Sequence, residues 1–375
     1  MSRVLVLNAG SSSLKWSVLH SDTEVVAGAN VAWRSQATED RANQLQATLR
    51  RLPSFDRAGH RVVHGGSRFR EAVAIDEPVR RGLAGIEHLD PEHMRPALAG
   101  IDAVASTFPE VVQVAAFDTA FHRTLPDAAT GYGLPFEWSE RFRLERFGFH
   151  GLSVAYAVER ASELLGATLP RMVVCHLGSG CSLTAVERGR SLDTTMGFTP
   201  LEGPMMATRS GSIDPGLLCH LQTHCGITTE QLRDTLTRSS GLLGVSGVSS
   251  DLRQVLSAAQ AGSARAQLAY DRFVLGIRRS LGAMVGVLGG IDVLVFTGGI
   301  GENSPRIRRC AARALAFAGL ELDEAANASD AARRATSSEE TDRVISRQGS
   351  PIAALVIRAR EDLTILKEVL RLCAL

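Results

Sequence analysis

The first twenty residues consist of two apolar runs separated by one short polar turn. Residues 3–7 are apolar after Arg3, and residues 14–20 form a second run that is rich in apolar side chains. Between them, NAGSSSLK (residues 8–15) contains a glycine, three consecutive serines and a lysine. Two apolar runs around a turn of small residues are typical of a β-hairpin. The hydroxyl and amide groups of such a turn suit a phosphate ligand.

The same pattern begins again at Met172. The segment MVVCHLGSGCSLTAVERGRSLDT contains an apolar run, a turn of small residues, and a second run that leads into another turn. In an alignment without gaps, Val4 falls on Val173 and Ser13 falls on Ser182, at one constant offset. This repeat indicates two domains built on one plan, each of which offers its first hairpin turn to a shared ligand.

Two further short strands end in residues of chemical interest. HRVVHGG (residues 60–66) ends in paired glycines, and VVQVAAF (residues 111–117) delivers Asp118 at its carboxyl end. Both runs are rich in β-branched or aromatic side chains, which favours strands over helices. Asp118 is therefore expected at the edge of a sheet.

A third glycine-rich turn follows the apolar strand at residues 292–297. The turn is predicted at residues 298–303, with Ser304 at the N-cap and Pro305 at the first position of an amphipathic helix. A strand, a glycine turn and a helix N-terminus in this order make an anion site. Three Gly/Ser turns on two repeated domains indicate that a nucleotide lies in a cleft between the domains.

Helical patterns complete the outline of the chain. The most apolar window, residues 281–300, contains Asp292 and is predicted to be a helix that ends at Gly289-Gly290 before a strand, and no membrane span. Residues 361–375 have apolar side chains at helical spacing, and residues 323–349 are predicted to form surface helix and loop.

The domain boundaries follow from the restart of the pattern. The N-terminal domain is predicted to span residues 1–149 and to include a returning helix at residues 363–375. The nucleotide-binding domain is predicted to span residues 150–362. A chain of 375 residues is long enough for two hydrophobic cores.

Composition narrows the class of partner. Lys plus Arg number 41 against 40 Asp plus Glu, so a net charge of +1 gives no reason to expect nucleic acid or an anionic membrane. The N-terminus does not have the composition of a signal peptide. Six cysteines without a CxxC pair are expected to be reduced thiols, which predicts a cytoplasmic protein.

One local cluster raises the question of a metal. CHLQTHC places Cys219, His220, His224 and Cys225 together, and the two histidines share a helix face at i,i+4 spacing. No glutamate follows in an HExxH pattern, so a plain helix surface is the favoured interpretation. Whether the cluster binds a metal is left open.

The nucleotide motifs of other folds are missing, and the motifs that are present resemble those of the acetate kinase family. There is no GxxxxGK[ST], and no GxGxxG opens a helix after the first strand. The resemblance covers the chain from the first strand to residue 303. It rests on eight motifs in the family's order, namely NAGSSSLK, HRVVHGG, FDTAFH, FGFHG, MGFTPLEG, RSGSIDP, GLLGVSGVSSDLR and GGIGEN.

This resemblance implies a fold and a reaction. The fold would be α/β, with two duplicated ribonuclease-H-like domains of mixed sheets and an interdomain nucleotide cleft, as in the actin, sugar-kinase and heat-shock-chaperone superfamily. The reaction would be reversible phosphoryl transfer between ATP and a short carboxylate. A carboxylate is already an anion at pH 7, so it needs no general base. Repulsion from the phosphates is the difficulty, which cations and fixed dipoles reduce.

By resemblance, four residues carry the chemistry. Arg61 would bind the acceptor carboxylate, and Arg209 would stabilise the transferring phosphoryl group, to which His150 would also hydrogen-bond. Asp118 has an essential catalytic role in the family that is sometimes described as acid/base. The chemistry of a carboxylate acceptor favours a different role for Asp118, which is to orient the metal shell or the arginines.

The remaining contacts are also carried over by resemblance. Asn8 and Glu361 match positions that hold Mg²⁺, or Mn²⁺ in its place, although the flanks of Glu361 (RAREDL) depart from the family pattern. The resemblance also implies that the chain forms a homodimer, as the family does. The residues expected to contact ATP or ADP are Lys15, His176, Leu177, Gly178, Ser179, Gly180, Asp251, Leu252, Arg253, Gly299, Ile300, Gly301, Glu302 and Asn303.

Two departures affect the expected site. Ser179 replaces an asparagine in the second turn, which predicts a weaker phosphate contact but no loss of ATP. EHLDPEH has His88-Leu89-Asp90-Pro91 where the family has Leu-His-Asn-Pro, so one wall of the methyl pocket is altered. Val63 and Pro200 keep two apolar walls. The size of the acceptor is therefore left open.

The resemblance thus implies a magnesium-dependent acetate kinase with direct in-line transfer. A kinase that prefers propionate or butyrate is the alternative if the pocket is wider. A nucleotide-gated binding module of the same fold is the alternative from another class, and Arg61 and Arg209 weigh against it. A pyrophosphate-using variant is disfavoured by GGIGEN and SSDLR. The physiological direction and the oligomeric state are left open.

Overall fold

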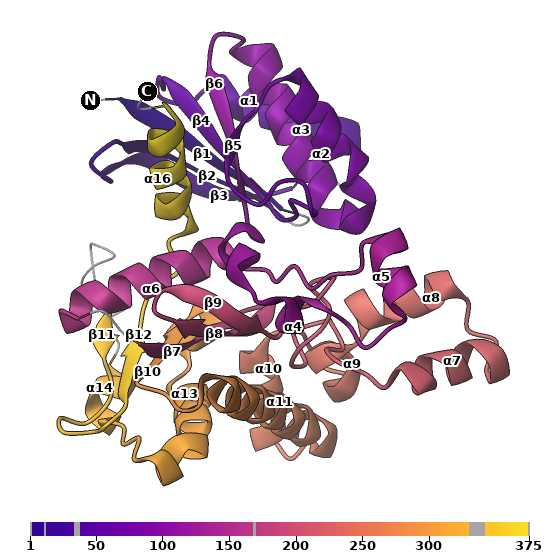
Figure 1. Ribbon diagram of the computed structural model, residues 1–375, viewed down its shortest axis with the longest axis vertical. Coiled ribbons are helices and arrows are strands. Elements are labelled where there is room, and N and C mark those ends of the chain that lie inside the picture. The colour runs from indigo at the N-terminus through magenta and orange to yellow at the C-terminus, as the bar shows by residue number, and fades with distance from the viewer. Residues whose placement is uncertain (1, 11–12, 34–37, 168–169, 330–341, 374–375) are drawn as a thin grey trace. The chain divides into compact units, whose positions relative to one another are not determined.

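The computed structural model describes residues 2–10, 13–33, 38–167, 170–329 and 342–373, and the described chain divides into two compact units (Figure 1). The first unit contains Met1–Arg123, Phe149–Tyr156 and Arg360–Leu375, and the second contains Thr124–Gly148 and Ala157–Ala359. None of the described helices combines the length and the apolar character that crossing a membrane requires.

The units depart from the predicted domain boundaries in three places. Residues 150–156 and 360–362 belong to the first unit instead of the second, and Thr124–Gly148 belongs to the second instead of the first. Hydrogen bonds explain the last difference: Thr124 Oγ1 donates to Ser191 O at 3.0 Å, and Phe147 N donates to Gly197 O at 3.1 Å. These partners lie far along the chain, so the local pattern of residues 124–148 could not reveal where the segment packs.

The first unit contains a six-stranded mixed sheet in the order β3-β2-β1-β4-β6-β5. β1 pairs antiparallel with β2 and parallel with β4, β4 pairs parallel with β6, and the short β5 closes the edge in antiparallel fashion. The predicted first hairpin is confirmed by the register of β1 against β2. The strands are β1 (Arg3–Ala9), β2 (Ser13–His20), β3 (Val25–Ala32), β4 (Arg57–Val62), β5 (Val73–Ala74) and β6 (Val112–Phe117).

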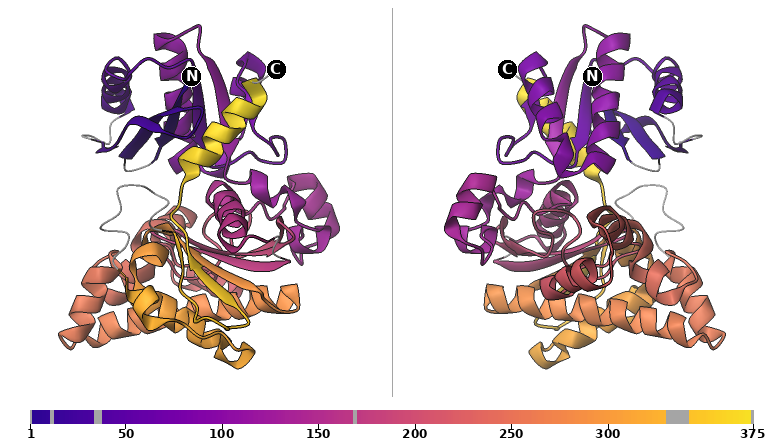
Figure 2. Two further views of the ribbon diagram at one scale, coloured as in Figure 1. Left: turned by 90° about the vertical axis from the view of Figure 1, so that its left-hand side faces the viewer. Right: turned by 90° about the vertical axis from the view of Figure 1, so that its right-hand side faces the viewer.

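β1 is apolar at every position from Val4 to Leu7, so apolar side chains point to both faces of this sheet. Other elements cover both faces. Val4 and Val6 pack against the C-terminal helix α16, whereas Leu5 and Leu7 share a core with α1 and α3. Figure 2 shows α16, in yellow, lying along the sheet of this unit. The helices are α1 (Thr38–Leu49), α2 (Glu77–Gly85), α3 (Pro91–Thr107), α16 (Glu361–Cys373) and the beginning of α6 (Gly151–Leu165).

Gly59 permits the close approach of α16 to β4. A Cβ at this position would lie 2.5 Å from Ile365 Cγ2 and 2.8 Å from Val369 Cγ2. The predicted C-terminal helix is therefore confirmed, and its buried side chains complete the core of the first unit.

The second unit repeats the topology of the first. Its sheet has the order β11-β12-β10-β7-β8-β9, with antiparallel β7–β8 and β8–β9 pairs and parallel β7–β10 and β10–β12 pairs. β7, β8, β9, β10, β11 and β12 correspond to β1, β2, β3, β4, β5 and β6, so the predicted duplicated α/β fold is confirmed. The strands are β7 (Arg171–Leu177), β8 (Cys181–Glu187), β9 (Arg190–Thr194), β10 (Val293–Thr297), β11 (Arg343–Val344) and β12 (Ala353–Val356).

The long helix of the second unit ends where the sequence predicts. Its N-cap, Ser263, accepts a hydrogen bond from Ala266 N, and it ends at Gly289, whose φ of 65° is accessible to glycine at little cost. The α-helices of this unit, besides the rest of α6, are α4 (Asp127–Thr130), α5 (Phe136–Phe142), α7 (Pro215–His224), α8 (Thr229–Asp234), α9 (Gly241–Ser246), α10 (Leu252–Gln260), α11 (Ala264–Leu288), α12 (Gly298–Asn303), α13 (Pro305–Ala312) and α14 (Glu324–Ala328). Shorter 3₁₀ and π turns occupy Glu87–Leu89, Ala120–Thr124, Thr235–Ser239 and Arg313–Ala318.

Two local expectations were wrong. Residues 298–303 form the short helix α12 instead of an open turn, because the buried guanidinium of Arg308 binds the carbonyls of Gly301 and Glu302 at its end. Ser304 separates α12 from α13. The segment 323–349 contains the edge strand β11 in addition to the helix α14, since β12 supplies its antiparallel partner. Residues 330–341 of that segment lie outside the described residues.

Candidate active site

The first sheet brings three predicted residues to one edge. Asn8 is the penultimate residue of β1, Arg61 is the penultimate residue of β4, and Asp118 directly follows β6. β1 pairs in parallel with β4, and β4 with β6. Parallel neighbouring strands have their carboxyl ends at the same edge of a sheet, where α/β proteins bind their ligands. Three motifs that are far apart in the sequence therefore contribute to one cluster.

Arg61 and Asp118 form a bidentate pair at the centre of this cluster. Arg61 Nε donates to Asp118 Oδ1 at 3.0 Å, and Nη2 donates to Oδ2 at 2.6 Å. The Asp118 side chain is 1% exposed and that of Arg61 is 18% exposed. Burial raises the pKa of Asp118, and Arg61 acts in the opposite direction. Although burial alone would lower it, Asp118 and Glu361 raise the pKa of Arg61, which keeps the guanidinium charged.

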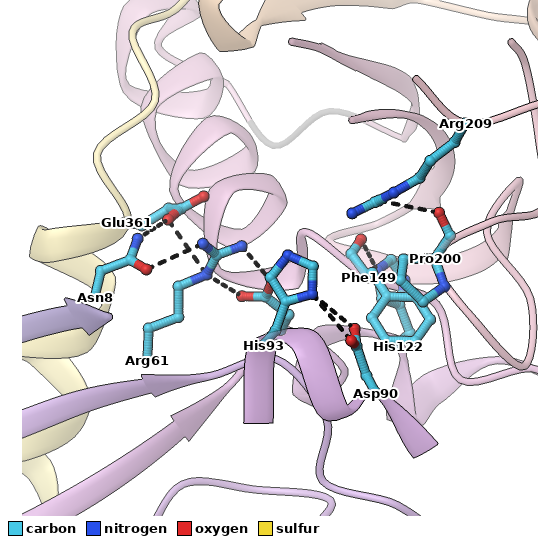
Figure 3. A network of polar contacts seen from close by, with 10 residues as sticks. Asn8, Arg61, Asp90, His93, His122, Phe149, Pro200, Arg209 and Glu361 are labelled. Atoms are coloured by element: carbon cyan, nitrogen blue, oxygen red, sulfur yellow. Dashed lines mark hydrogen bonds and ion pairs between the residues drawn. The ribbon is translucent and has the colours of Figure 1, made fainter. Parts of the chain in front are cut away.

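Asn8 and Glu361 lie beside this pair and supply oxygen atoms. Arg61 Nη1 donates to Asn8 Oδ1 at 3.3 Å, Asn8 Nδ2 donates to Glu361 Oε2 at 3.3 Å, and Arg61 Nε lies 3.5 Å from Glu361 Oε2 (Figure 3). An amide oxygen and a carboxylate that is 17% exposed are the hard donors that Mg²⁺ prefers. These two residues therefore fit a magnesium ion that keeps several waters.

His150 is held by the segment that follows Asp118. Gly151 N donates to Asp118 O at 2.7 Å, and a Cβ on Gly151 would clash with that same carbonyl. His150 itself has a φ of 60°, a left-handed conformation that is rare for residues other than glycine. His122 Nε2 donates to Phe149 O at 3.0 Å, and burial lowers the pKa of His122 to about 4. The structure thus ties His150 to the strand end that carries Asp118, in a conformation typical of functional sites.

The altered motif EHLDPEH changes the surroundings of the glycines after β4 less than its sequence indicates. His88 is exposed, and its Nδ1 donates to Gly85 O at 3.1 Å. Leu89 is half-buried and lies beside Gly66, since a Cβ on Gly66 would be 3.8 Å from Leu89 Cδ1. Val63 is buried, 8% exposed. An apolar side chain from the altered motif therefore lies next to the glycines that follow β4, and the polar ring of His88 has another partner.

In the second unit, the turn after β7 lies next to the beginning of α12. Gly178 N donates to Gly180 O at 2.9 Å and closes the predicted turn. A Cβ on Gly178 would lie 3.8 Å from Gly299 N, and a Cβ on Gly298 would lie 2.8 Å from Leu177 O. His176 and Leu177 are buried, whereas Ser179 is exposed at the tip. Two of the three predicted glycine turns are therefore adjacent in space, and at Gly298 only a glycine permits their approach.

Buried charges hold α12 in place, and one of them was missed at the sequence level. Arg308, 1% exposed, donates from Nη1 to Gly301 O and Glu302 O, both at 2.8 Å. The carboxylate of Glu302 accepts from Ala359 N at 2.9 Å, and burial raises the pKa of Glu302. The predicted N-cap at Ser304 is confirmed by its bond from Ile307 N. Nothing in the run PRIRR distinguishes Arg308 from an exposed arginine.

Four other predicted nucleotide contacts have simpler surroundings. Asp251 is the N-cap of α10, accepts from Arg253 N and also pairs with the Arg253 guanidinium at 2.6 Å. Leu252 is buried, and Lys15 is exposed on β2 in register with Asn8. Their roles toward ATP stay predictions.

Arg209 and Pro200 are linked directly within the second unit. Arg209 Nη1 donates to Pro200 O at 3.2 Å (Figure 3), and Met206 N donates to Arg209 O at 3.1 Å. The first bond ties the arginine expected at the phosphoryl group to the segment expected to line the acceptor pocket. The two predicted residues are thus in direct contact within the second unit.

Tyr132 and Arg146 hold the segment that contains Pro200, and sequence reasoning missed both. The Tyr132 hydroxyl accepts from Phe198 N at 2.6 Å and donates to Glu202 Oε2 at 3.1 Å. Arg146 donates to Glu202 Oε1 at 2.8 Å and to Met196 O at 3.1 Å. Burial raises the pKa of Tyr132 to about 12, so the hydroxyl keeps its proton. These residues come from the segment that was assigned to the wrong domain, which explains the omission.

The CHLQTHC cluster lies on α7 and at its end. The rings of His220 and His224 have centroids 5.0 Å apart, and Cys219 and Cys225 are exposed. Within the described residues, no group of three or more His, Cys, Asp or Glu side chains is placed to hold a metal ion. The structure therefore adds nothing in favour of a metal at this helix.

Comparison with known proteins agrees with the geometry. The model of the acetokinase family matches residues 22–367. The chain belongs to the acetokinase family. A curated acetokinase-family relative, an acetate kinase from Nostoc punctiforme, is 47% identical over 314 residues, which cover 83% of this chain and 75% of the relative.

Solved structures of the acetokinase family have the same fold. An acetate kinase from Porphyromonas gingivalis superposes with a TM-score of 0.88 and 32% identity, over 99% of this chain and 100% of that chain. A propionate kinase from Francisella tularensis superposes with a TM-score of 0.89 and 32% identity, over the same shares. The acetokinase fold by itself therefore does not distinguish two-carbon from three-carbon acceptors.

Proposed function

We propose that this acetokinase-family chain is an acetate kinase, which transfers a phosphoryl group reversibly from ATP to acetate and forms acetyl phosphate and ADP. The observation that carries the proposal is the bidentate Arg61–Asp118 pair at the edge of the first sheet, with Asn8 and Glu361 beside it. Such a cluster offers fixed charges to an anionic acceptor. A carboxylate nucleophile requires these charges and does not require a general base.

Each residue of the first unit has a distinct task in this proposal. Arg61 binds the acceptor carboxylate, and Asp118 holds the guanidinium in one orientation through two hydrogen bonds. Asp118 is a positioning residue, because its two oxygens are engaged by Arg61 and its exposure is 1%. The attacking oxygen of acetate then forms a bond to the γ-phosphorus while the bond to the ADP oxygen breaks, and no proton is transferred.

The phosphates of ATP require hydrogen-bond donors that leave room for the nucleotide, and backbone N–H groups meet this requirement. We infer that the backbone N–H groups of the turn at residues 176–180 and the N-terminal end of α12 contact ATP. Lys15, Arg209 and His150 supply charge or hydrogen bonds to the phosphoryl groups. Asn8 and Glu361 would hold Mg²⁺, which when bound offsets the negative charge of the phosphates. Use of Mn²⁺ stays a prediction.

Propionate is the second candidate acceptor, because a propionate kinase shares the fold at a TM-score of 0.89. Val63 and Leu89 present apolar surface near the glycines after β4, and their positions are compatible with an acceptor of two or three carbons.

The relatives are named as kinases, so they do not favour a binding module without catalysis. The interdomain cleft, the homodimer, the cytoplasmic location and the physiological direction stay predictions.

Hydroxylamine trapping of the acyl phosphate tests the proposal. The enzyme is incubated with ATP, Mg²⁺ and acetate, propionate or butyrate, and the hydroxamate is measured. We expect acetate to give the highest kcat/KM, and Arg61→Gln to raise the KM for acetate much more than the KM for ATP. A preference for propionate would move the assignment to the second candidate. ATP binding without acyl phosphate from any of the acids would contradict the proposed function.

A further inference from the structure

The altered motif EHLDPEH contains a hydrogen-bonded pair that the proposed mechanism leaves unused. Asp90, at the N-cap of α3, is buried, and both of its carboxylate oxygens lie close to His93 Nδ1, at 3.0 and 3.1 Å. The carboxylate makes no capping bond to the α3 backbone. The side chain of His93 is 21% exposed, so the ring is accessible from solvent. An aspartate in this position usually caps the helix, and here it orients an imidazole instead.

The pair lies within electrostatic reach of the Arg61–Asp118 cluster. Burial raises the pKa of Asp118, and the charge of a protonated His93 is among the influences that lower it. The charge of Asp90 is likewise among the influences that raise the pKa of Arg61 against burial. Figure 3 shows the Asp90–His93 contact in the same view as Asn8, Arg61 and Glu361. The ring therefore belongs to the surroundings of the proposed acceptor site.

The charges of the cluster create a need for such a group. Arg61 has five N–H groups, and three of its hydrogen bonds are directed at Asp118 and Asn8. Asp118, Glu361 and Asp90 each bring a negative charge near this one guanidinium. Even with Mg²⁺ held at Glu361, an acetate ion would approach two carboxylates, Asp118 and Asp90, and a single arginine. A second cation beside Arg61 would reduce this repulsion.

We propose that His93, oriented by Asp90, is an anion-binding residue of the acceptor site that contacts the carboxylate of acetate or the acyl phosphate. This role rests on the proposed kinase function. With Nδ1–H donated to Asp90, the ring has Nε2 available for a ligand. In the imidazolium form, Nε2–H donates a charge-assisted hydrogen bond to the anion. Asp90 is the positioning residue, because it acts through the orientation of the ring.

A purely structural explanation makes different predictions. If the pair only fastens the beginning of α3, its loss lowers the free energy of unfolding and leaves the affinity for acetate unchanged. Asp90, at the beginning of the same helix, and Asp118, after β6, are the charged groups with which His93 is shown to interact. Loss of an anion contact would instead raise the KM for acetate and leave the free energy of unfolding close to that of the unmodified chain.

The variants are His93→Asn, Asp90→Asn and the double variant, with His88→Asn as the matched control. His88 lies in the same motif, is exposed and bonds to Gly85 O. For His93→Asn we expect the KM for acetate to rise about tenfold, which is the low end for a hydrogen bond to a charged group. The KM for ATP should change less than about twofold. Asp90→Asn should have a similar effect, and the double variant should be no worse than His93→Asn.

The KM for acetate, compared with the KM for ATP, is the readout that a structural role would not change. In His93→Asn the KM for acetate should rise while the KM for ATP and the melting temperature stay close to those of the unmodified enzyme. His88→Asn should keep both KM values. If the KM for acetate is unchanged in His93→Asn while the melting temperature falls, the pair is only a structural fastening and the inference is wrong.

Direct binding separates this inference from the kinase proposal. In protein with ¹⁵N-labelled histidine, the ring resonances that are missing in His93→Asn identify His93. Acetate or acetyl phosphate should shift the Nε2 resonance of His93 whether or not the enzyme turns over. Absence of acyl phosphate together with this shift would contradict the kinase function and keep the anion site. Turnover without any shift would contradict the anion site and keep the kinase.

Discussion

The two six-stranded sheets have one topology and two different chemistries. In the first unit, the carboxyl ends of β1, β4 and β6 carry Asn8, Arg61 and Asp118, whose side chains form a charged network. In the second unit, the corresponding ends of β7 and β10 lead into glycines. Duplication therefore supplied the scaffold twice, and the residues that follow the strands determine what each copy can bind.

The difference follows from the ligands that we propose for each copy. A small carboxylate has only two oxygens, so a few precisely oriented charges must bind it, and buried Asp118 provides this orientation. Phosphates have many oxygens that accept from backbone N–H groups, and these groups are accessible only where no side chain intervenes. Residue Ile357, which follows β12 in the place of Asp118, is fully buried and apolar. The following predictions test this contrast.

The largest effect is expected at Asp118. In Asp118→Asn the guanidinium of Arg61 loses its buried carboxylate, so kcat/KM should fall by about 10²- to 10³-fold in the hydroxamate assay. The matched control is Asp102→Asn, because Arg80 holds Asp102 by the same bidentate geometry at 2.7 and 2.6 Å on an exposed surface. A loss below tenfold in a folded Asp118→Asn enzyme would contradict the role of the pair.

Acid should destabilise the first unit. Burial lowers the pKa of both His60 and His122, which lie in that unit, to about 4. Below about pH 6.5 the unfolded chain binds a proton at each ring, and the folded chain does not until about pH 4. Stability should therefore fall as pH decreases through this window, by up to about 3 kcal/mol for each ring.

Urea unfolding at several pH values measures this effect, and hydrogen exchange locates it. Amides of the first sheet should lose protection at pH 5 before those of the second sheet. His60→Gln removes one titrating ring, so its stability should depend less on pH than that of the unmodified chain. Equal loss of protection in both sheets would show that these two rings do not control acid unfolding.

A smaller effect is expected at the glycine turns. Gly298 has a φ of 76°, and an added Cβ would lie 2.8 Å from Leu177 O. Gly298→Ala should raise the KM for ATP about tenfold and leave the KM for acetate unchanged, because the strain falls on the turn after β7. Gly289→Ala is the control, since its φ is 65° and no atom lies within 4 Å of the added Cβ. An equal change in both KM values would argue against separate tasks for the two sheets.

The smallest effect is expected at Glu361. Glu361→Gln keeps the size of the side chain but removes one charge beside Asn8, so the Mg²⁺ concentration for half-maximal activity should rise several-fold. Glu368→Gln on the same helix is the control, because Glu368 pairs with Arg371. An unchanged Mg²⁺ titration in Glu361→Gln would leave Asn8 without its proposed partner at the metal.

Much of the scaffold was predictable because its signals are local. The two hairpins, the end of α11 at Gly289 and the N-cap at Ser304 follow from short patterns of apolar, small and capping residues. The motif residues Arg61 and Asp118 were also identified from the sequence. The chemistry of the acceptor also indicated that Asp118 orients the metal shell or the arginines, but the bidentate contact with Arg61 was not predicted, since a strand pattern does not reveal which strands are neighbours.

The remaining features depend on contacts between segments that are distant in the chain. Arg308 looks like a surface arginine until Gly301 and Glu302 supply its acceptors, and the short β11 becomes a strand only because β12 pairs with it. His88 turned toward Gly85, contrary to the concern that it alters the acceptor pocket. The residue types at the strand ends and turns could be recognised from the amino-acid sequence, because these patterns are local. Tertiary structure decided their partners, since burial and hydrogen bonding are set by whatever the fold brings alongside.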